Sequence, residues 1–137
     1  MAPKEQFAYL GKALTKPQKL KVLKRTRELL ERPGGWVQGT FWTGKYTKQG
    51  LREDIPKMCL AGAAQWAAGE LGYLSGSGIT QYDRLATTEV ADHISLRDLA
   101  REKGFEGVPE FNDRSRTRKK DVLALIDERI AQLQAKA

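Results

Sequence analysis

The stretch from Pro56 to Glu70 constrains the fold of this chain more than any other part of its sequence. Apolar and small residues occupy nearly every position in it, and Gln65 and Glu70 are the chief exceptions. Proline is tolerated in a first helical turn, so Asp54-Ile55-Pro56 predicts the start of a helix. Because a helix without a polar face belongs at the centre of a small protein, we expect the other elements to pack around residues 56–70.

Four further segments have the capping residues or the apolar spacing of helices. The first begins at Thr15, where Thr15-x-x-Gln18 forms a capping box, and it ends at Pro33-Gly34-Gly35. Its apolar residues fall on one half of the helical wheel, so that half is expected to be buried. The other three helices are expected at residues 81–93, at residues 96–103 after an N-cap at Ser95, and from about Thr117 onward.

Residues 36–46 are rich in aromatic and β-branched side chains, interrupted by Thr43-Gly44-Lys45, and this pattern predicts a short β-hairpin. Residues 108–111 are expected to be extended. The predicted fold class is mainly α (α+β), a compact bundle of about five helices with one short β-hairpin. A chain of 137 residues is expected to form a single helical domain, here over residues 15–137, after a flexible basic arm over residues 1–14.

Three short segments have an unusual composition. They are Trp36-Val37-Gln38-Gly39, then Cys59-Leu60-Ala61-Gly62-Ala63, and then Phe111-Asn112-Asp113 followed by Arg116-Thr117. As a set they resemble the pattern of a family of small, uncharacterised proteins from actinobacteria and their phages, over about residues 20–133. Phe111 stands where that family usually has Trp, and Ser115 stands where it usually has Gly. The resemblance implies the architecture given above and implies no function.

The segments are expected to act structurally. Gln38 shares a strand face with Trp36, so we expect its amide to be buried and to clip the hairpin to the main chain of a turn at Asn112. Asn112-Asp113 is expected to form that turn, with Asp113 paired to Arg116. The residues expected to have structural roles are Trp36, Gln38, Gly39, Cys59, Gly62, Trp66, Asn112, Asp113, Arg116 and Thr117.

The net charge of +7 is concentrated near the N-terminus. Residues 1–32 contain nine Lys or Arg and three Glu, a balance of +6, which leaves +1 for the rest of the chain. A second basic cluster lies at residues 114–120. Basic segments attract phosphate backbones or acidic protein surfaces, although many are merely solvated helix faces. The residues expected to contact a partner are Lys21, Lys24, Arg25, Arg32, Phe7 and Tyr9.

Cys59 is the only cysteine, which excludes an internal disulfide and a cysteine-based metal cluster. Its thiol is expected to be buried and inert, because free cysteine behaves as a small hydrophobic residue. The single His93 and the scattered carboxylates have no metal-ligand spacing, so we expect neither a metal nor another cofactor. With no secretory signal or membrane-spanning apolar run in the sequence, a cytoplasmic protein is expected, without membrane contact.

The function expected from these observations is that of a small non-enzymatic binding protein. It would use the basic first helix and the arm to contact a protein, which would be a host protein if a phage encodes the chain. Nucleic-acid binding through the same basic face is the alternative. A second alternative is a cysteine-dependent enzyme, because Gln38, Cys59, His93 and Asn112 follow the order found in papain-like enzymes. Those enzymes need strands where residues 79–105 here have helical signals.

Overall fold

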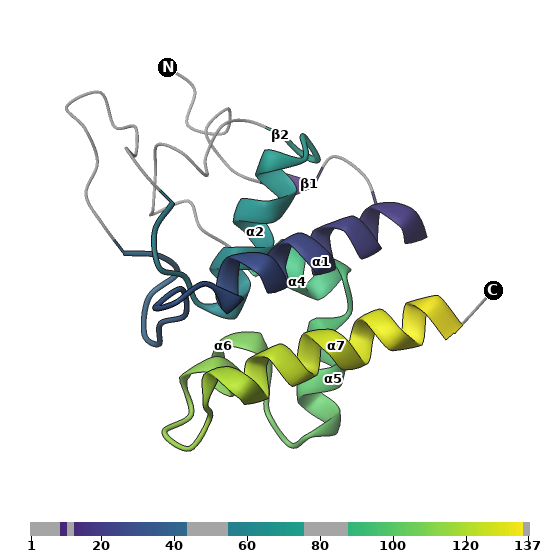
Figure 1. Ribbon diagram of the computed structural model, residues 1–137. Coiled ribbons are helices and arrows are strands. Elements are labelled where there is room, and N and C mark those ends of the chain that lie inside the picture. The colour runs from purple at the N-terminus through teal and green to yellow at the C-terminus, as the bar shows by residue number, and fades with distance from the viewer. Residues whose placement is uncertain (1–8, 11–12, 44–54, 76–87, 136–137) are drawn as a thin grey trace.

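The computed structural model describes residues 9–10, 13–43, 55–75 and 88–135. Six helices make up most of this part of the chain, as expected for a mainly α fold (Figure 1). They are α1 (Lys16–Glu31), α2 (Leu60–Glu70), α4 (Glu89–His93), α5 (Leu96–Glu102), α6 (Val108–Asp113) and α7 (Lys119–Ala135). Two short antiparallel strands, β1 (Tyr9–Leu10) and β2 (Leu74–Ser75), pair with each other. None of the helices within the described ranges is long and apolar enough to cross a membrane.

Helix α2 lies at the centre of the helical packing, where its apolar sequence requires it to be. Every residue from Leu60 to Ala68 is buried, including Gln65. Helices α1, α4 and α6 all pack against α2, and α7 covers α1 and α5 (Figure 1). Trp66 of α2 meets Trp42 edge to face, with the ring centroids 5.8 Å apart. The predicted central position of this apolar segment is therefore confirmed.

The predicted start of α2 is wrong by four residues. Residues 57–59 are extended because their backbone groups bond to the segment at residues 35–43. Met58 forms a parallel bridge with Trp36 and an antiparallel bridge with Trp42. The Cys59 amide donates to the Phe41 carbonyl over 3.1 Å. The hairpin predicted over residues 36–46 is not confirmed, since both tryptophans pair with Met58 and residues 44–46 lie outside the described part.

The other helix boundaries agree with the sequence in part. The capping box of α1 is present, because the Thr15 hydroxyl accepts from Gln18 N and the Gln18 side chain accepts from Thr15 N. Helix α5 is followed by Gly104 at φ +95°, but Ser95 makes no side-chain capping bond and lies at φ +65°. The count of about five helices is not confirmed, and residues 81–87 of one predicted helix lie outside the described ranges.

Two differences concern the C-terminal third of the chain. Residues 108–111, expected to be extended, belong to α6, and Pro109 is in its first turn, where the missing amide hydrogen has no helical partner to lose. Helix α7 begins at Lys119, two residues after the predicted start, and the Asp121 carboxylate accepts from Arg118 N over 2.8 Å. Thr117 is buried just before this helix.

Part of the predicted N-terminal arm is attached to the body of the protein. Residues 9 and 10 form β1, and their partners in β2 directly follow the turn after α2. Leu14 is buried in the core. Phe7 and the other residues of the arm before Tyr9 lie outside the described part of the chain.

Gly62 is expected to tolerate no side chain. A Cβ atom built there would lie 2.1 Å from the Phe41 carbonyl oxygen and 2.8 Å from its carbonyl carbon, which are backbone atoms held by the bond to Cys59 N. We therefore expect Gly62→Ala to lower the free energy of unfolding by about 3 kcal/mol, measured by urea denaturation.

Gly107→Ala is the matched control. Its Cβ would meet the flexible end of the Glu110 side chain at 3.0 Å, and the φ of −172° at Gly107 suits any residue. Its effect should stay below about 1 kcal/mol. Equal stability of Gly62→Ala and wild type would contradict the close approach of Phe41 to α2.

Candidate functional site

The Asn112 side chain joins three segments that are far apart in the sequence. It is fully buried at the end of α6. Its Oδ1 accepts from Trp36 Nε1 over 2.7 Å and from Leu60 N over 3.0 Å. Its Nδ2 donates to the Val37 carbonyl over 3.2 Å and to the Asp113 carboxylate over 2.8 Å. Two donors and two acceptor positions are all that an asparagine amide offers, so Asn112 is saturated.

Gln38 and Asp113 complete this network from its exposed side. Gln38 Nε2 donates to the carbonyls of Asn112 and Arg114, each over 2.9 Å. These carbonyls lie at the C-terminal end of α6, where helical partners are missing. Gly39, at φ +86°, donates its amide hydrogen to the Asp113 carboxylate over 2.9 Å. The clip predicted between Gln38 and the main chain near Asn112 is present, although Gln38 is exposed and not buried.

Asp113 differs from its predicted role. The sequence predicts a pair with Arg116 in a turn before the last helix, but Asp113 is the final residue of α6. Its Oδ1 receives two hydrogen bonds, from Gly39 N and from Asn112 Nδ2, and this draws it toward residues 36–39. Arg116 is exposed and lies beside a different surface, described below.

Cys59 acts as the N-cap of α2. Its Sγ accepts from Gly62 N over 3.3 Å, and the residue is only 7% exposed. Burial raises the pKa of the Cys59 thiol to about 11, against the smaller opposing effect of the amide hydrogens of Gly62 and Ala61. The group is therefore a neutral thiol at pH 7, and a neutral thiol is a poor nucleophile.

The four residues of the enzyme hypothesis do not form one cluster of side chains. Gln38 and Asn112 are hydrogen-bonded, and Cys59 adjoins them through Leu60 N. His93, at the end of α4, is exposed, and its Nε2 is 3.9 Å from the Glu89 carboxylate. It lines a separate hollow together with Thr88, Glu89, Asp92 and Arg97. Within the described residues, no group of three His, Cys, Asp or Glu side chains could hold a metal ion.

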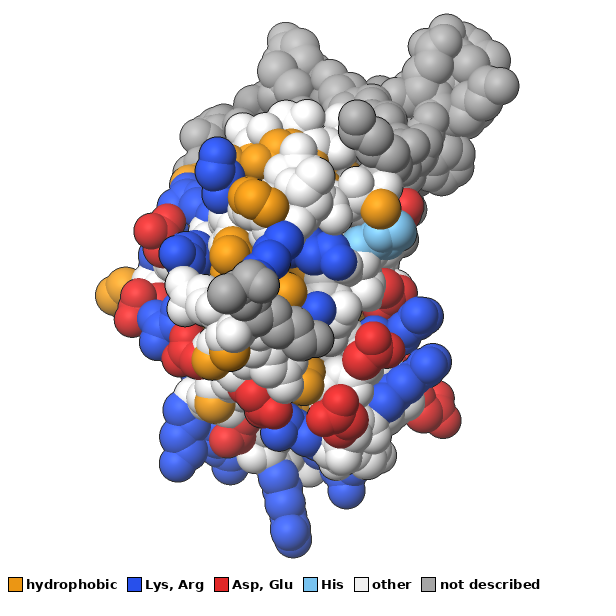
Figure 2. Space-filling model, turned by 90° about the vertical axis from the view of Figure 1, so that its right-hand side faces the viewer, with side chains coloured by type: hydrophobic (Ala, Val, Ile, Leu, Met, Phe, Trp, Pro, Cys, Tyr) orange, Lys and Arg blue, Asp and Glu red, His pale blue; other side chains and the backbone are white. Residues whose placement is uncertain are grey.

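The basic residues of α1 fall into two groups. Arg25 bonds to Glu70 of α2 over 2.7 Å, and the Arg32 side chain donates to the carbonyls of Leu29 and Pro56. These two predicted partner-contact residues are thus engaged within the molecule. Lys21 and Lys24 are exposed. On the face where α1 begins and α7 ends, basic and acidic side chains are interspersed (Figure 2).

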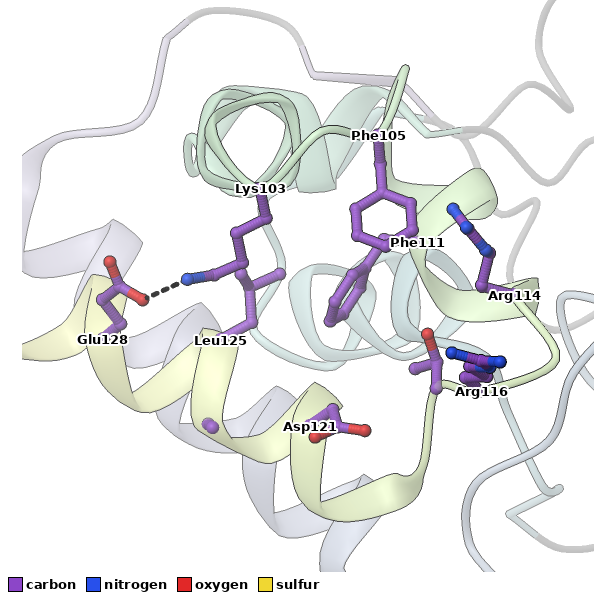
Figure 3. Close-up of a pocket in the computed structure, with 10 residues that line it drawn as sticks. Lys103, Phe105, Phe111, Arg114, Arg116, Asp121, Leu125 and Glu128 are labelled. Atoms are coloured by element: carbon purple, nitrogen blue, oxygen red, sulfur yellow. Dashed lines mark ion pairs between the residues drawn. The ribbon is translucent and has the colours of Figure 1, made fainter.

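A hollow between α5, α6 and α7 was not identified from the sequence. Phe105, Phe111, Arg114 and Arg116 line it together with residues of α7 (Figure 3). The basic cluster at residues 114–120, close to two phenylalanines, was the available signal. The fold is needed to show that Lys103 and Glu128 face these residues across the same hollow.

Substitution of Asn112 should be strongly destabilising. Asn112→Ala leaves the partly buried Trp36 donor and the buried Leu60 donor without their acceptor, so we expect a loss of about 3 kcal/mol in the free energy of unfolding. Asn112→Asp retains the acceptor but places a carboxylate beside Asp113. Burial and the neighbouring carboxylate favour the protonated form of the new aspartate. The stability deficit of Asn112→Asp relative to wild type should therefore shrink as the pH falls from 7 toward 4. A deficit that grows on acidification would contradict the network.

Cys59 should make the fold sensitive to alkaline pH. The unfolded thiol ionises first as the pH rises, because its pKa lies below the folded value of about 11. The stability that this shift contributes is therefore complete below about pH 8 and is lost between about pH 9 and 11, by up to about 2 kcal/mol. Chemical denaturation of wild type and Cys59→Ala from pH 7 to 11 measures it. The difference between the two proteins should narrow with rising pH, and a constant difference would contradict burial of the thiol.

Comparisons with known proteins identify a family without an assigned activity. No curated protein and no solved structure matches the chain. The sequence model described as a family of unknown function (DUF6197) matches residues 15–132, from the capping box of α1 to the last turn of α7. This match confirms the resemblance to an uncharacterised family and covers all three motif segments. The chain belongs to this family of unknown function, DUF6197.

Proposed function

We propose that this protein is a non-enzymatic binding protein that contacts an acidic surface of a partner protein through α1. The contact surface is the α1 lysine face, which we define as Lys16, Lys21 and Lys24, all exposed. Lysine side chains on a helix provide long, mobile positive charges that attract carboxylates and speed association.

The position of the lysines along α1 is the observation that carries this proposal. Residues 16–27 contain six Lys or Arg and no Asp or Glu, and the first turn has no acidic residue. The N-terminus of a helix is the positive end of its dipole, where carboxylates stabilise and cations destabilise the helix by about 0.3–1 kcal/mol each. A face needed only for solubility would be more stable with acidic residues there, so the lysines favour a binding role.

The other basic residues of α1 strengthen the argument. Arg25 and Arg27 pair with Glu28 and Glu31, so residues 25–31 of the helix are neutral as a group. Arg27 also pairs with Asp127 of α7 over 2.6 Å. The uncompensated positive charge is therefore concentrated in residues 16–24, on a helix that its arginines attach to α2 and α7.

The state of Cys59 supports a role without catalysis. Its thiol is buried, caps α2 and is neutral at pH 7, so it lacks the thiolate that a cysteine enzyme uses. The resemblance to phage proteins would make the partner a protein in the cytoplasm of a bacterial host. Nucleic acid is the alternative ligand of the α1 lysine face, and the experiment below separates the two.

Affinity capture from a lysate of the bacterial host, with and without nuclease, tests this function. We expect to capture a protein whose binding persists after nuclease treatment. This binding should weaken as the salt concentration is raised. Lys21→Glu with Lys24→Glu should reduce its binding by about tenfold or more at low salt, because two exposed attractions become repulsions. Arg25 is left intact, since its bond to Glu70 joins α1 to α2.

Lys57→Glu with Lys120→Glu is the matched control. Both residues are exposed and lie outside α1, and the change in net charge is the same. This control should bind as wild type does. Equal losses in the two double variants would indicate a response to overall charge and contradict a specific face. Loss of all captured protein after nuclease treatment would favour nucleic acid as the ligand.

A further inference from the structure

The hollow between α5, α6 and the start of α7 has an apolar floor. Its volume is about 520 Å³. The rings of Phe105 and Phe111 meet edge to face with centroids 5.2 Å apart, and Ala124 and Leu125 of α7 continue the apolar surface. In Figure 3 the two rings stand between Arg114 and Arg116 on one side and the Lys103–Glu128 pair on the other. Phe105 remains partly exposed to solvent, whereas Phe111 beneath it is buried.

The positive and negative charges around this floor do not cancel. Lys103 and Glu128 neutralise each other over 3.1 Å, whereas the Asp121 carboxylate accepts only the neutral backbone amide of Arg118 and keeps its negative charge. Arg114 lies with its guanidinium 5.4 Å from the centre of the Phe105 ring, and Arg116 is exposed beside it. In the described part of the chain, no ion pair joins either arginine to a carboxylate. The rim formed by these two arginines is therefore positive, and with Asp121 and the Lys103–Glu128 pair included the lining of the hollow has a net charge of +1.

The loop that carries these arginines is braced at several points. Thr117 N donates to the Arg114 carbonyl over 2.9 Å, and that carbonyl also accepts from Gln38. Arg118 Nη1 donates to the Ser115 carbonyl over 2.9 Å. A loop whose backbone is already braced loses little further backbone entropy when a ligand binds its side chains. The network around Asn112 thus helps to hold one rim of the hollow.

We propose that this hollow binds a peptide segment of a partner protein in which an apolar side chain is flanked by carboxylates. The inference rests on the proposed function in one respect, that the ligand belongs to a protein. The apolar side chain would pack on Phe105 and Phe111, and the carboxylates would pair with Arg114 and Arg116. Aromatic residues and arginine are the side chains most enriched where interfaces gain their energy.

The opposite rim favours a peptide over a nucleic acid. Asp121 lines the hollow on the α7 side without a cationic partner among the described residues and would repel a chain of phosphates, and Glu128 already binds Lys103. A peptide places charges only where its sequence does, and its backbone amides can donate to these carboxylates. The volume of about 520 Å³ also lies in the range of pockets that enclose a compact ligand group.

Titration of a synthetic probe peptide, followed by fluorescence anisotropy, tests this site. The probe is a labelled pentapeptide with a central phenylalanine flanked on each side by two aspartates. We expect saturable binding to the full-length protein with a Kd below about 1 mM. Replacement of the phenylalanine by alanine, or of the aspartates by asparagines, should weaken binding by about tenfold, since each removes one of the two interactions. Absence of binding by the phenylalanine–aspartate probe would overturn the proposal.

Variants of the protein locate the binding. Ala124 is exposed on α7 and lines the hollow, so Ala124→Phe should fill it and weaken binding by about tenfold or more. Ala131→Phe, at an exposed position two turns further along α7, is the matched control and should bind as wild type does. Arg114→Ala with Arg116→Ala should weaken binding by about tenfold, whereas Lys120→Ala should leave binding unchanged. Equal binding by Ala124→Phe and Ala131→Phe would overturn the proposal.

The same titration separates this inference from the proposed function. Lys21→Glu with Lys24→Glu should bind the probe as wild type does, because neither lysine lines the hollow. Loss of probe binding in that variant would count against the hollow as the site. Equal affinity of Ala124→Phe and wild type for the probe would contradict the hollow as the binding site. That outcome would leave the capture result for the α1 lysine face unaffected.

Discussion

The structure depends above all on the saturated amide of Asn112. Its four hydrogen bonds connect the segment at residues 36–39, the first amide of α2 and the end of α6. The Asn112 amide and the Leu60 amide hydrogen are buried, and the Trp36 indole and the Val37 carbonyl are partly buried. An unpaired buried donor or acceptor costs about 1–3 kcal/mol. One side chain therefore removes several such penalties at once, which no apolar residue of the same size could do. This explains why a short helix of six residues, α6, has a fixed position against α2.

The residues of the conspicuous sequence motifs form the contacts of the fold, and the candidate surfaces for a partner lie elsewhere. Gly62 lets the Phe41 backbone approach α2, Cys59 caps that helix with its sulfur, and Gln38 covers the end of α6. All three residues make their specific contacts within the protein itself. The α1 lysine face and the two arginines of the hollow are exposed groups without such tasks. In this chain the residues with the most distinctive pattern stabilise the fold, and the candidate binding residues are ordinary lysines, arginines and phenylalanines.

Local signals predicted much of the fold, and long-range pairing accounts for most of the errors. The capping box at Thr15 and the apolar composition of α2 depend only on neighbouring residues, and both predictions are confirmed. The start of α2 depends on bonds from residues 57–59 to residues 35–43, which no local pattern reveals. Pro109 fits an extended segment and a first helical turn equally well, so α6 was missed. The Gln38 clip could be inferred because a polar side chain beside Trp36 needs partners, whereas the hollow combines residues from three elements.

The two candidate surfaces belong to helices that are joined at two places along their contact. Arg27 of α1 pairs with Asp127 of α7, and Lys119 Nζ donates to the carbonyls of Glu31 and Arg32 at the end of α1. A cation at the C-terminal end of a helix also interacts favourably with the negative end of the helix dipole. Because α1 and α7 are held together in this way, the α1 lysine face and the hollow keep a fixed separation. A partner that contacts both would bind the second site as an intramolecular step, with an effective concentration set by this geometry. Two contacts of modest affinity would then suffice for a specific complex.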